Sequence, residues 1–258
     1  MRLRELVMLG KVGGFMAGKI EGFRNKLLYS LRFKGEVEDW IVKDGKSGVI
    51  TGSIDELYEW LGVERKLEDS FLEAEEYEYA RAVDSKVEIK MGGAGPAILL
   101  YEACRVIRPE LVLESGVAFG WSSCAILSAM SRNKRGRLIS IDRPYWFDES
   151  KKVLIGKAVP DSLKKRWSLY IGSNRKWLKR KRIAEGMLFD IVFYDSDKSF
   201  VGKAEWIEFM MGYLKTGGLL IVDDIGDDSF FDWYTAKKGI EAWRLQYVSK
   251  SCGVIRKQ

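Results

Sequence analysis

The sequence predicts an α/β fold: a mostly parallel, seven-stranded, Rossmann-like sheet with helices on both faces, a C-terminal antiparallel strand pair and a helical N-terminal extension. From residue 109 onward, short apolar segments alternate with amphipathic ones, which is typical of strand and helix units in a parallel sheet. Several apolar segments end on an acid or a glycine turn, as strands that hold a ligand at their carboxyl ends do. Before about residue 90 the sequence has the texture of helices and connectors. We therefore expect an extension over residues 1–88 and a cofactor-binding domain over 89–258.

The first part of the extension has a helical pattern. Residues 1–33 place apolar side chains at roughly helical spacing with basic residues between them, although five glycines lower the helix propensity. A stretch rich in glycine and charge follows to about Gly52 and reads as a connector. Ser53 is a predicted N-cap with Glu56 at the third helical position, which opens a helix through Trp60. A second, acidic and aromatic helix is expected over residues 68–83.

Seven short apolar segments of the second part read as strands. They cover residues 111–114, 137–142, 167–171, 190–194, 218–222, 245–248 and 253–256, the last two as the antiparallel pair. Helices are expected between them, chiefly over residues 121–131, 200–214 and 235–243.

Composition excludes several kinds of site. The 258 residues include no histidine, which removes Ser-His-Asp and Cys-His nucleophiles and imidazole metal sites. Three cysteines lie far apart without CxxC spacing, so neither a disulfide framework nor a zinc site is expected, in keeping with a cytoplasmic protein. No apolar run approaches the roughly 18 to 20 residues that span a bilayer, and the N-terminus lacks the features of a signal peptide.

Basic residues concentrate in two segments. Residues 1–34 hold eight Lys or Arg against two acids, and residues 151–182 hold twelve against one. Both segments favour an anionic partner, either RNA, an anionic membrane surface or a phosphorylated substrate. The alternative is that they are solvated faces of helices or contacts in a homo-oligomer, and the sequence leaves this choice open.

A glycine turn follows the strand at residues 111–114. The segment LVLESGVAFGWSS carries an acid, Glu114, then Gly116 and Gly120, and then a helix start with Trp121 and Ser122. Glycine permits the positive φ and the close backbone approach that a bound cofactor requires. The segment is neither GxGxxG nor a P-loop, and its acid argues for a cationic or amino-bearing ligand. Asp142, at the end of the next strand, is placed to accept hydrogen bonds from ribose hydroxyls.

Carboxylates also end two later strands. FDIVFYDSDKSF ends a strand at Asp195, and GGLLIVDDI ends one at Asp223 and Asp224. Three carboxylates that meet without histidine or thiolate describe a site for a hard cation, Mg²⁺, Mn²⁺ or Ca²⁺. The alternative is that Asp195 only hydrogen-bonds a cofactor or caps a helix.

These motifs, together with the strand RLISID at residues 137–142, resemble the class I S-adenosylmethionine-dependent methyltransferases. The likeness covers residues 91–256 and is greatest to the catechol and caffeoyl-coenzyme A O-methyltransferases. It implies that Glu114, Gly116 and Ser122 hold the methionine part of the cofactor, with Gly92 and Gly93 close by. It further implies that Asp142 binds the ribose and that Ser173 and Asn174 flank the adenine. Gly120, Trp121 and Asp195 complete the predicted cofactor set.

The same resemblance implies the chemistry. The positions of Asp195, Asp223 and Asp224 bind a divalent metal in the family, and that of Lys198 supplies a general base. A hydroxyl is a poor nucleophile until its proton is removed, which a bound metal and a base both favour. The family usually has Asp-Asn where this chain has Asp223-Asp224, so the site here is more anionic. A related group has a comparable acidic segment with His in place of Lys198.

The sequence thus predicts S-adenosylmethionine-dependent O-methylation of a small hydroxylated acceptor, assisted by Lys198, Asp195 and a metal ion. RNA and a lipid or glycan headgroup at a membrane surface are the competing acceptors, and the basic N-terminal arm would bind either one. A non-catalytic cofactor-binding module tethered by that arm is the alternative from a different class.

Overall fold

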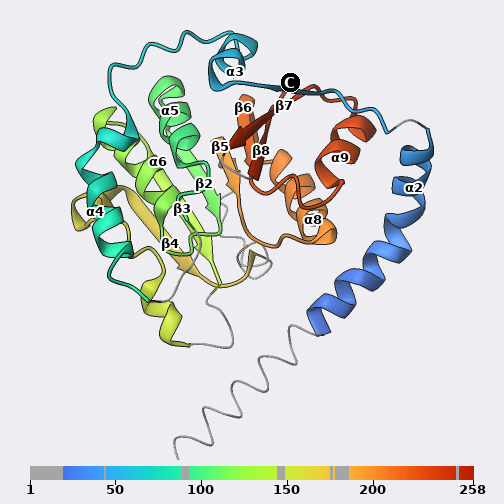
Figure 1. The fold of residues 1–258 in the computed structure, drawn as a ribbon, viewed down its shortest axis with the longest axis horizontal. Helices are drawn as coiled ribbons and strands as arrows, with labels where there is room; N and C mark the ends of the chain where they lie inside the picture. Colours follow the sequence, from blue (N-terminus) through green and yellow to red (C-terminus); the bar gives the residue numbers. More distant parts are fainter. Residues whose placement is uncertain are drawn as a thin grey trace, which may run out of the picture.

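The computed structural model describes residues 20–43, 45–88, 93–143, 149–174, 177, 186–247 and 250–258. Its centre is an eight-stranded sheet with the strand order β1-β7-β8-β6-β5-β2-β3-β4 (Figure 1). The strands are β1 Val49–Gly52, β2 Leu111–Ser115, β3 Arg137–Asp142, β4 Trp167–Ile171, β5 Phe189–Tyr194, β6 Leu214–Val222, β7 Ala242–Tyr247 and β8 Lys250–Arg256. The helices are α2 Lys34–Val42, α3 Ile54–Trp60, α4 Glu75–Asp84, α5 Ala97–Ile107, α6 Trp121–Arg132, α8 Phe200–Met211 and α9 Phe230–Lys238, with short 3₁₀ helices η1 Phe71–Glu73, η2 Glu149–Leu154 and η3 Asp161–Arg166.

The sheet is parallel except for one strand. Strand β8 pairs antiparallel with both β6 and β7, which confirms the predicted C-terminal pair. Strand β2 lies between β3 and β5 and is parallel to both. The order therefore reverses beside β2, and in open parallel sheets such a reversal creates the crevice in which ligands bind.

The prediction of seven strands was wrong by one, because the extension contributes β1. Val49–Gly52 pairs in parallel with β7 and extends the sheet at its edge. The β-branched run Val49, Ile50 and Thr51 favours an extended backbone. It is short, half-exposed and set among glycines, which is why the sequence predicted a connector here. Gly52 is required there, since a Cβ atom would lie 2.5 Å from the Trp243 ring.

Side chains alternate between the two faces of the sheet. Val112, Ile191 and Phe193 pack with α5 and α6 in one buried cluster, whereas Leu113, Val192 and Tyr194 pack with α8 and α9 in the other. This is the period-two pattern of strands covered on both sides. Residues of the extension, including Tyr58 and Phe71, belong to the first cluster, so α3 and η1 complete the same core.

Local signals in the extension have the expected geometry. Ser53 caps α3 and forms the reciprocal capping box with Glu56. The predicted acidic helix is shorter than expected, because η1 and a turn occupy its first residues before α4 starts at Glu75. In the second part of the chain, helix α9 starts at Phe230, five residues earlier than predicted, and ends at Lys238.

A long helical segment lies along the outside of α8 and α9 (Figure 1). Residues 20–32 are helical and lead into α2. The Tyr29 ring packs edge-on against Phe200 at 5.0 Å, and the Phe33 ring contacts both Phe200 and Trp233. Within the described part of the chain, no helix is both long and apolar enough to cross a membrane.

Candidate functional site

The glycine turn after β2 is fixed by a close approach to the end of β5. Gly116 has φ +94°, and a Cβ atom there would lie 1.9 Å from the carbonyl oxygen of Asp195. The two strand ends are joined by a hydrogen bond from the Asp195 N–H to the Ser115 carbonyl. Gly120 has φ +101°, and a Cβ atom there would lie 2.8 Å from the Cα atom of Gly156. Only glycine combines this backbone conformation with such contacts, so both predicted glycines are required by the fold itself.

Glu114 lies beneath the turn and is fully buried. Its carboxylate accepts hydrogen bonds from the hydroxyls of Ser122, Ser123 and Ser140, which come from the first turn of α6 and from β3. Burial raises the pKa of Glu114 to about 7, against the lowering effect of these hydrogen bonds. The carboxylate is thus satisfied by the protein's own hydroxyls and supports the turn from below.

Asp142 joins the end of β3 to the same turn. One carboxylate oxygen accepts the N–H groups of Val117 at 3.2 Å and Ala118 at 2.7 Å. Ala118 adopts φ +48°, which is uncommon for a residue other than glycine, and the hydrogen bond from its N–H to Asp142 holds it there. Burial raises the pKa of Asp142, while these backbone hydrogen bonds lower it. The acid is thereby oriented at the mouth of the crevice.

One pocket of about 1080 Å³ opens at this crevice. Its walls include six residues from the ends of the four strands β2, β3, β4 and β5: Gly116, Asp142, Arg143, Ser173, Asn174 and Asp195. Asn174 is oriented by its side-chain amide, which donates to the Ser115 hydroxyl at 2.8 Å. The opposite wall comes from α8 and from helical residues 21–29, among them Arg24, Asn25 and Tyr29.

The remaining predicted cofactor residues fall outside the pocket lining. Trp121 and Ser122 begin α6 behind the turn, with Trp121 buried in the core and Ser122 bonded to Glu114. Gly93 lies in the segment before α5, where an added Cβ atom would have no neighbour within 4 Å. Gly92 is outside the described residues, as are residues 1–19 of the basic arm and several residues of the basic segment 151–182.

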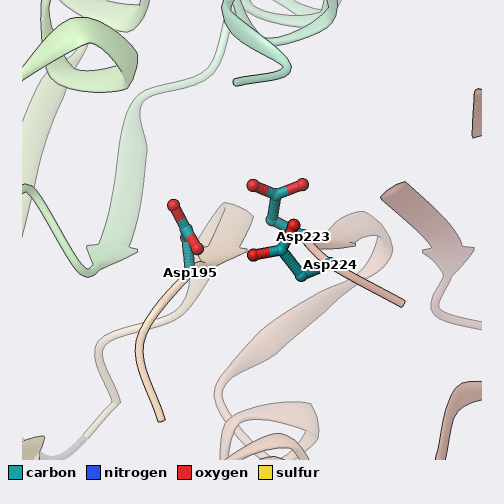
Figure 2. A group of neighbouring side chains, drawn as sticks. All are labelled: Asp195, Asp223 and Asp224. Atoms are coloured by element: carbon teal, nitrogen blue, oxygen red, sulfur yellow. The ribbon is translucent and has the colours of Figure 1, made fainter. Parts of the chain in front are cut away.

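The structure brings together the three predicted metal ligands (Figure 2). Asp195 follows β5, and Asp223 and Asp224 follow β6, so all three reach the same edge of the sheet. One carboxylate oxygen from each lies within 4.8 Å of the others. Asp223 and Asp224 are buried, and Asp224 is held in the left-handed region at φ +52°. Figure 2 shows the Asp224 carboxylate directed toward Asp195.

The cluster already contains cations of the protein itself. The Lys198 ammonium pairs with Asp195 and lies 2.6 Å from an oxygen of Asp224. The Lys250 ammonium lies 2.7 Å from the other oxygen of Asp224, and the Tyr247 hydroxyl donates to Asp223. Each carboxylate therefore has a donor partner.

Burial and the charges within the cluster shift the pKa values of Lys198, Asp223 and Asp224. Burial opposes the ammonium form of Lys198, but Asp195 and Asp224 outweigh it and raise the pKa of Lys198 to about 12. Burial, with the nearby charge of Asp195, raises the pKa of Asp223 to about 6. For Asp224 the effect of burial is outweighed by hydrogen bonds from Lys198 and Lys250, which lower its pKa. Lys198 is accordingly an ammonium at neutral pH in this arrangement.

The donor set fits a hard divalent cation. Carboxylate oxygens are the ligands that Mg²⁺ and Ca²⁺ prefer, and three of them converge here. The Lys198 ammonium occupies the space between two of these carboxylates, so a metal would have to displace it from Asp195 and Asp224. Metal binding and the position of Lys198 are therefore coupled.

Three residues that support the cluster were missed by sequence reasoning. Tyr247 ends β7 and Lys250 begins β8, and the antiparallel register that places Val222 opposite Gly253 carries both to the end of β6. Lys203 of α8 is only 1% exposed, and its ammonium contacts the Asp224 carbonyl and Asp228. The antiparallel pair, which the sequence did predict, was the one signal that could have located Lys250.

A sequence profile described as a methyltransferase domain matches residues 113–225, from β2 to just past the acidic cluster. No protein with curated annotation matches the chain.

Solved structures with the same fold include several O-methyltransferases. One is the enzyme of tomaymycin synthesis from Streptomyces achromogenes in complex with S-adenosylmethionine, at 18% identity and a TM-score of 0.54 over 80% of this chain and 96% of that one. Another is an O-methyltransferase from Bacillus cereus in complex with S-adenosylhomocysteine, at 17% identity and a TM-score of 0.52 over 79% of this chain and 97% of that one. A candidate caffeoyl-CoA O-methyltransferase from Staphylococcus aureus has 16% identity and a TM-score of 0.55 over 78% of this chain and 96% of its own. Residues 113–225 thus match a methyltransferase domain, and the chain has the fold of these O-methyltransferases, two of which were solved with S-adenosylmethionine or S-adenosylhomocysteine.

Proposed function

We propose that the protein transfers the methyl group of S-adenosylmethionine to a hydroxyl oxygen of a small acceptor. The observation that carries this proposal is the composition of the pocket. Gly116, Asp142 and Asn174 at the strand-order reversal line the same pocket as Asp195, which belongs to the acidic cluster. Its volume of about 1080 Å³ is at the upper end for small-molecule sites, enough for a nucleoside cofactor and an acceptor together.

We assign the cofactor to the crevice beside β2. Gly116 leaves room for the methionine part to approach the backbone closely. Asp142 has one oxygen fixed by the turn, which orients the carboxylate to accept ribose hydroxyls. Ser173 and Asn174 border the adenine. Glu114 we now assign a supporting role, since its carboxylate is engaged by three hydroxyls below the turn.

The acceptor fits between Asp195 and the helical wall. Tyr29, Phe200 and Phe209 give this part of the pocket an aromatic lining, and Asn25 is fixed there by a hydrogen bond to the Ser199 hydroxyl at 3.0 Å. Arg24 and Arg143 add positive charge at the rim, although Glu205 and Glu21 partly neutralise it. A flat or aromatic acceptor with a polar substituent suits this wall better than an extended polymer does.

The chemistry is an in-line displacement. The acceptor oxygen forms a bond to the methyl carbon as the bond from that carbon to the sulfonium sulfur breaks, which leaves S-adenosylhomocysteine. The acceptor's proton must leave at the same stage. We assign its removal to Lys198, which can accept it only as the neutral amine, after release from its ion pairs with Asp195 and Asp224. A divalent cation on Asp195, Asp223 and Asp224 would lower the pKa of the acceptor hydroxyl. The chain's main contribution is to hold the acceptor oxygen in line, about 3 Å from the methyl carbon.

The test is a methyl-transfer assay with isotopically labelled S-adenosylmethionine and a panel of phenols, catechols and aliphatic alcohols, each with its methoxy counterpart. We expect S-adenosylhomocysteine to form with at least one hydroxylated compound and not with its methoxy counterpart. If the protein binds cofactor but methylates nothing in the panel, and methylates RNA or a lipid headgroup instead, the small-molecule assignment is wrong. If it methylates none of these acceptors, the protein is a cofactor-binding module.

A further inference from the structure

The outer face of the N-terminal helix carries an apolar stripe without a partner in the described structure. Ile20, Phe23, Leu27 and Leu31 are spaced three or four residues apart, which places them on one side of a helix. Their exposed fractions are 64%, 69%, 48% and 73%, far above what a packed apolar side chain shows. We call these four residues the outer stripe.

The other side of this helix is already used. Tyr29 packs on Phe200, Asn25 bonds to Ser199, and both line the pocket. The helix is therefore anchored by its inner face to the body of the protein, so the exposure of the outer stripe is not that of an undocked helix. A contiguous apolar surface of this kind marks an interaction site more often than an isolated exposed residue does.

Basic residues accompany the outer stripe. Over residues 20–34 there are four, Arg24, Lys26, Arg32 and Lys34, against a single acid, Glu21. Arg24 and Arg32 also lie 3.8 and 3.4 Å from Glu205, and Lys34 lies 3.7 Å from Glu38. These are surface pairs, which are worth little in water and leave the cations open to anionic headgroups. The preceding nineteen residues of the sequence add four more against one acid. An apolar helix face with Lys and Arg beside it is the pattern of a helix that lies in the plane of a membrane surface, its apolar side chains among the acyl chains and its cations at anionic headgroups.

We propose that the outer stripe docks the protein on an anionic lipid bilayer. A second copy of the chain is the less favourable occupant, because a symmetric pairing of this face would bring two basic helices against each other. The described part of the chain has no helix that could span the bilayer, in keeping with a helix that lies on the surface. Because the inner face of the same helix lines the pocket, docking would place the acceptor wall next to the lipid surface.

The experiment measures sedimentation of the full-length protein with vesicles of phosphatidylglycerol and phosphatidylcholine, and with vesicles of phosphatidylcholine alone. The variant is Leu27→Ser, which removes apolar surface without changing charge. Leu72→Ser is its matched control, since both leucines are 48% exposed and Leu72 lies on η1, outside the outer stripe. Circular dichroism checks that each variant is folded.

We expect the wild type and Leu72→Ser to bind the anionic vesicles but not those of phosphatidylcholine alone, and salt to weaken this binding. Leu27→Ser should bind the anionic vesicles about tenfold more weakly, because part of the apolar area buried in the membrane is lost. Equal binding of Leu27→Ser and wild type would overturn the proposal, as would no binding of the wild type to anionic vesicles. A wild-type dimer in sedimentation velocity that Leu27→Ser dissociates, without vesicle binding, would assign the outer stripe to a second copy. None of these readouts depends on methyl transfer, so failure here is separate from failure of the proposed function.

Discussion

The ammonium of Lys198 lies 2.6 Å from the Asp224 carboxylate while it also pairs with Asp195. Lys198 therefore links the ends of β5 and β6 at the point where a hard cation would bind. A cation and this ammonium compete for the same two carboxylates, so the residue proposed as the base also controls access to the metal site.

Substitution of Lys198 by Met should separate these two roles. Loss of a proton acceptor should lower turnover by about 100-fold or more, while the affinity for S-adenosylhomocysteine stays unchanged. Mg²⁺ affinity should rise, because the competing ammonium is gone. Steady-state kinetics and calorimetry test this, with the exposed Lys66→Met as control. Unchanged turnover in a folded Lys198→Met protein would remove Lys198 from the mechanism.

The acidic cluster can be tested without activity. Asp223→Asn should abolish the heat of Mg²⁺ binding, because one of three carboxylate ligands becomes a neutral amide. The control is Asp227→Asn, which alters an exposed acid three residues from Asp224 on the same loop. If wild type and both variants give the same Mg²⁺ heat, the metal lies elsewhere, and if the wild type gives none, the cluster serves only as an ion-pair network.

Gly116→Ala should abolish cofactor binding by collision rather than by backbone strain. Its Cβ would meet the Asp195 carbonyl at 1.9 Å, so the turn and the end of β5 must separate. Gly217→Ala carries a similar positive φ, +77°, with no atom within 4 Å, and should lose only about 1–2 kcal/mol of stability. Calorimetry with S-adenosylhomocysteine and urea unfolding of both variants distinguish the two effects. Wild-type affinity in Gly116→Ala would show that the turn is not the cofactor site.

Glu114 predicts a pH dependence of stability. Burial raises its pKa from the ordinary 4.5 to about 7 in the fold, so the folded state retains a proton that the unfolded chain loses. The contribution of Glu114 to the free energy of unfolding is complete below pH 4.5 and falls as the pH rises through about 7. The total loss is about 3 kcal/mol, and no further change follows at higher pH. Glu114→Gln should remove this part of the decline and leave the smaller part that comes from Asp223, whose pKa is raised to about 6. Urea unfolding at about pH 5 and about pH 7.5 measures it, with the exposed Glu110→Gln as control. The same decline in both variants would refute the assignment.

Much of the fold and of the acidic cluster was predictable because both follow from local patterns. Apolar strands ending on Asp142, Asp195 and Asp223 fix which acids reach the edge of the sheet, and the positive φ values of Gly116 and Gly120 follow from the turn. The glycine-rich run around β1 hid an edge strand, because its partner β7 lies almost 200 residues away in the sequence. Lys250 and Lys203 were missed for the same reason: their contacts with Asp224 depend on tertiary pairing, for which a single sequence has no periodic signal.

The central claim is that the crevice beside β2 binds S-adenosylmethionine. Calorimetric titration of S-adenosylhomocysteine into the full-length protein, once with EDTA and once with Mg²⁺, tests it without knowledge of the acceptor. We predict one site per chain with micromolar affinity, about 8 kcal/mol, in both conditions, and weaker binding by at least tenfold in Asp142→Ala. No binding of S-adenosylhomocysteine in either condition would contradict the account, since the glycine turn would then be purely architectural.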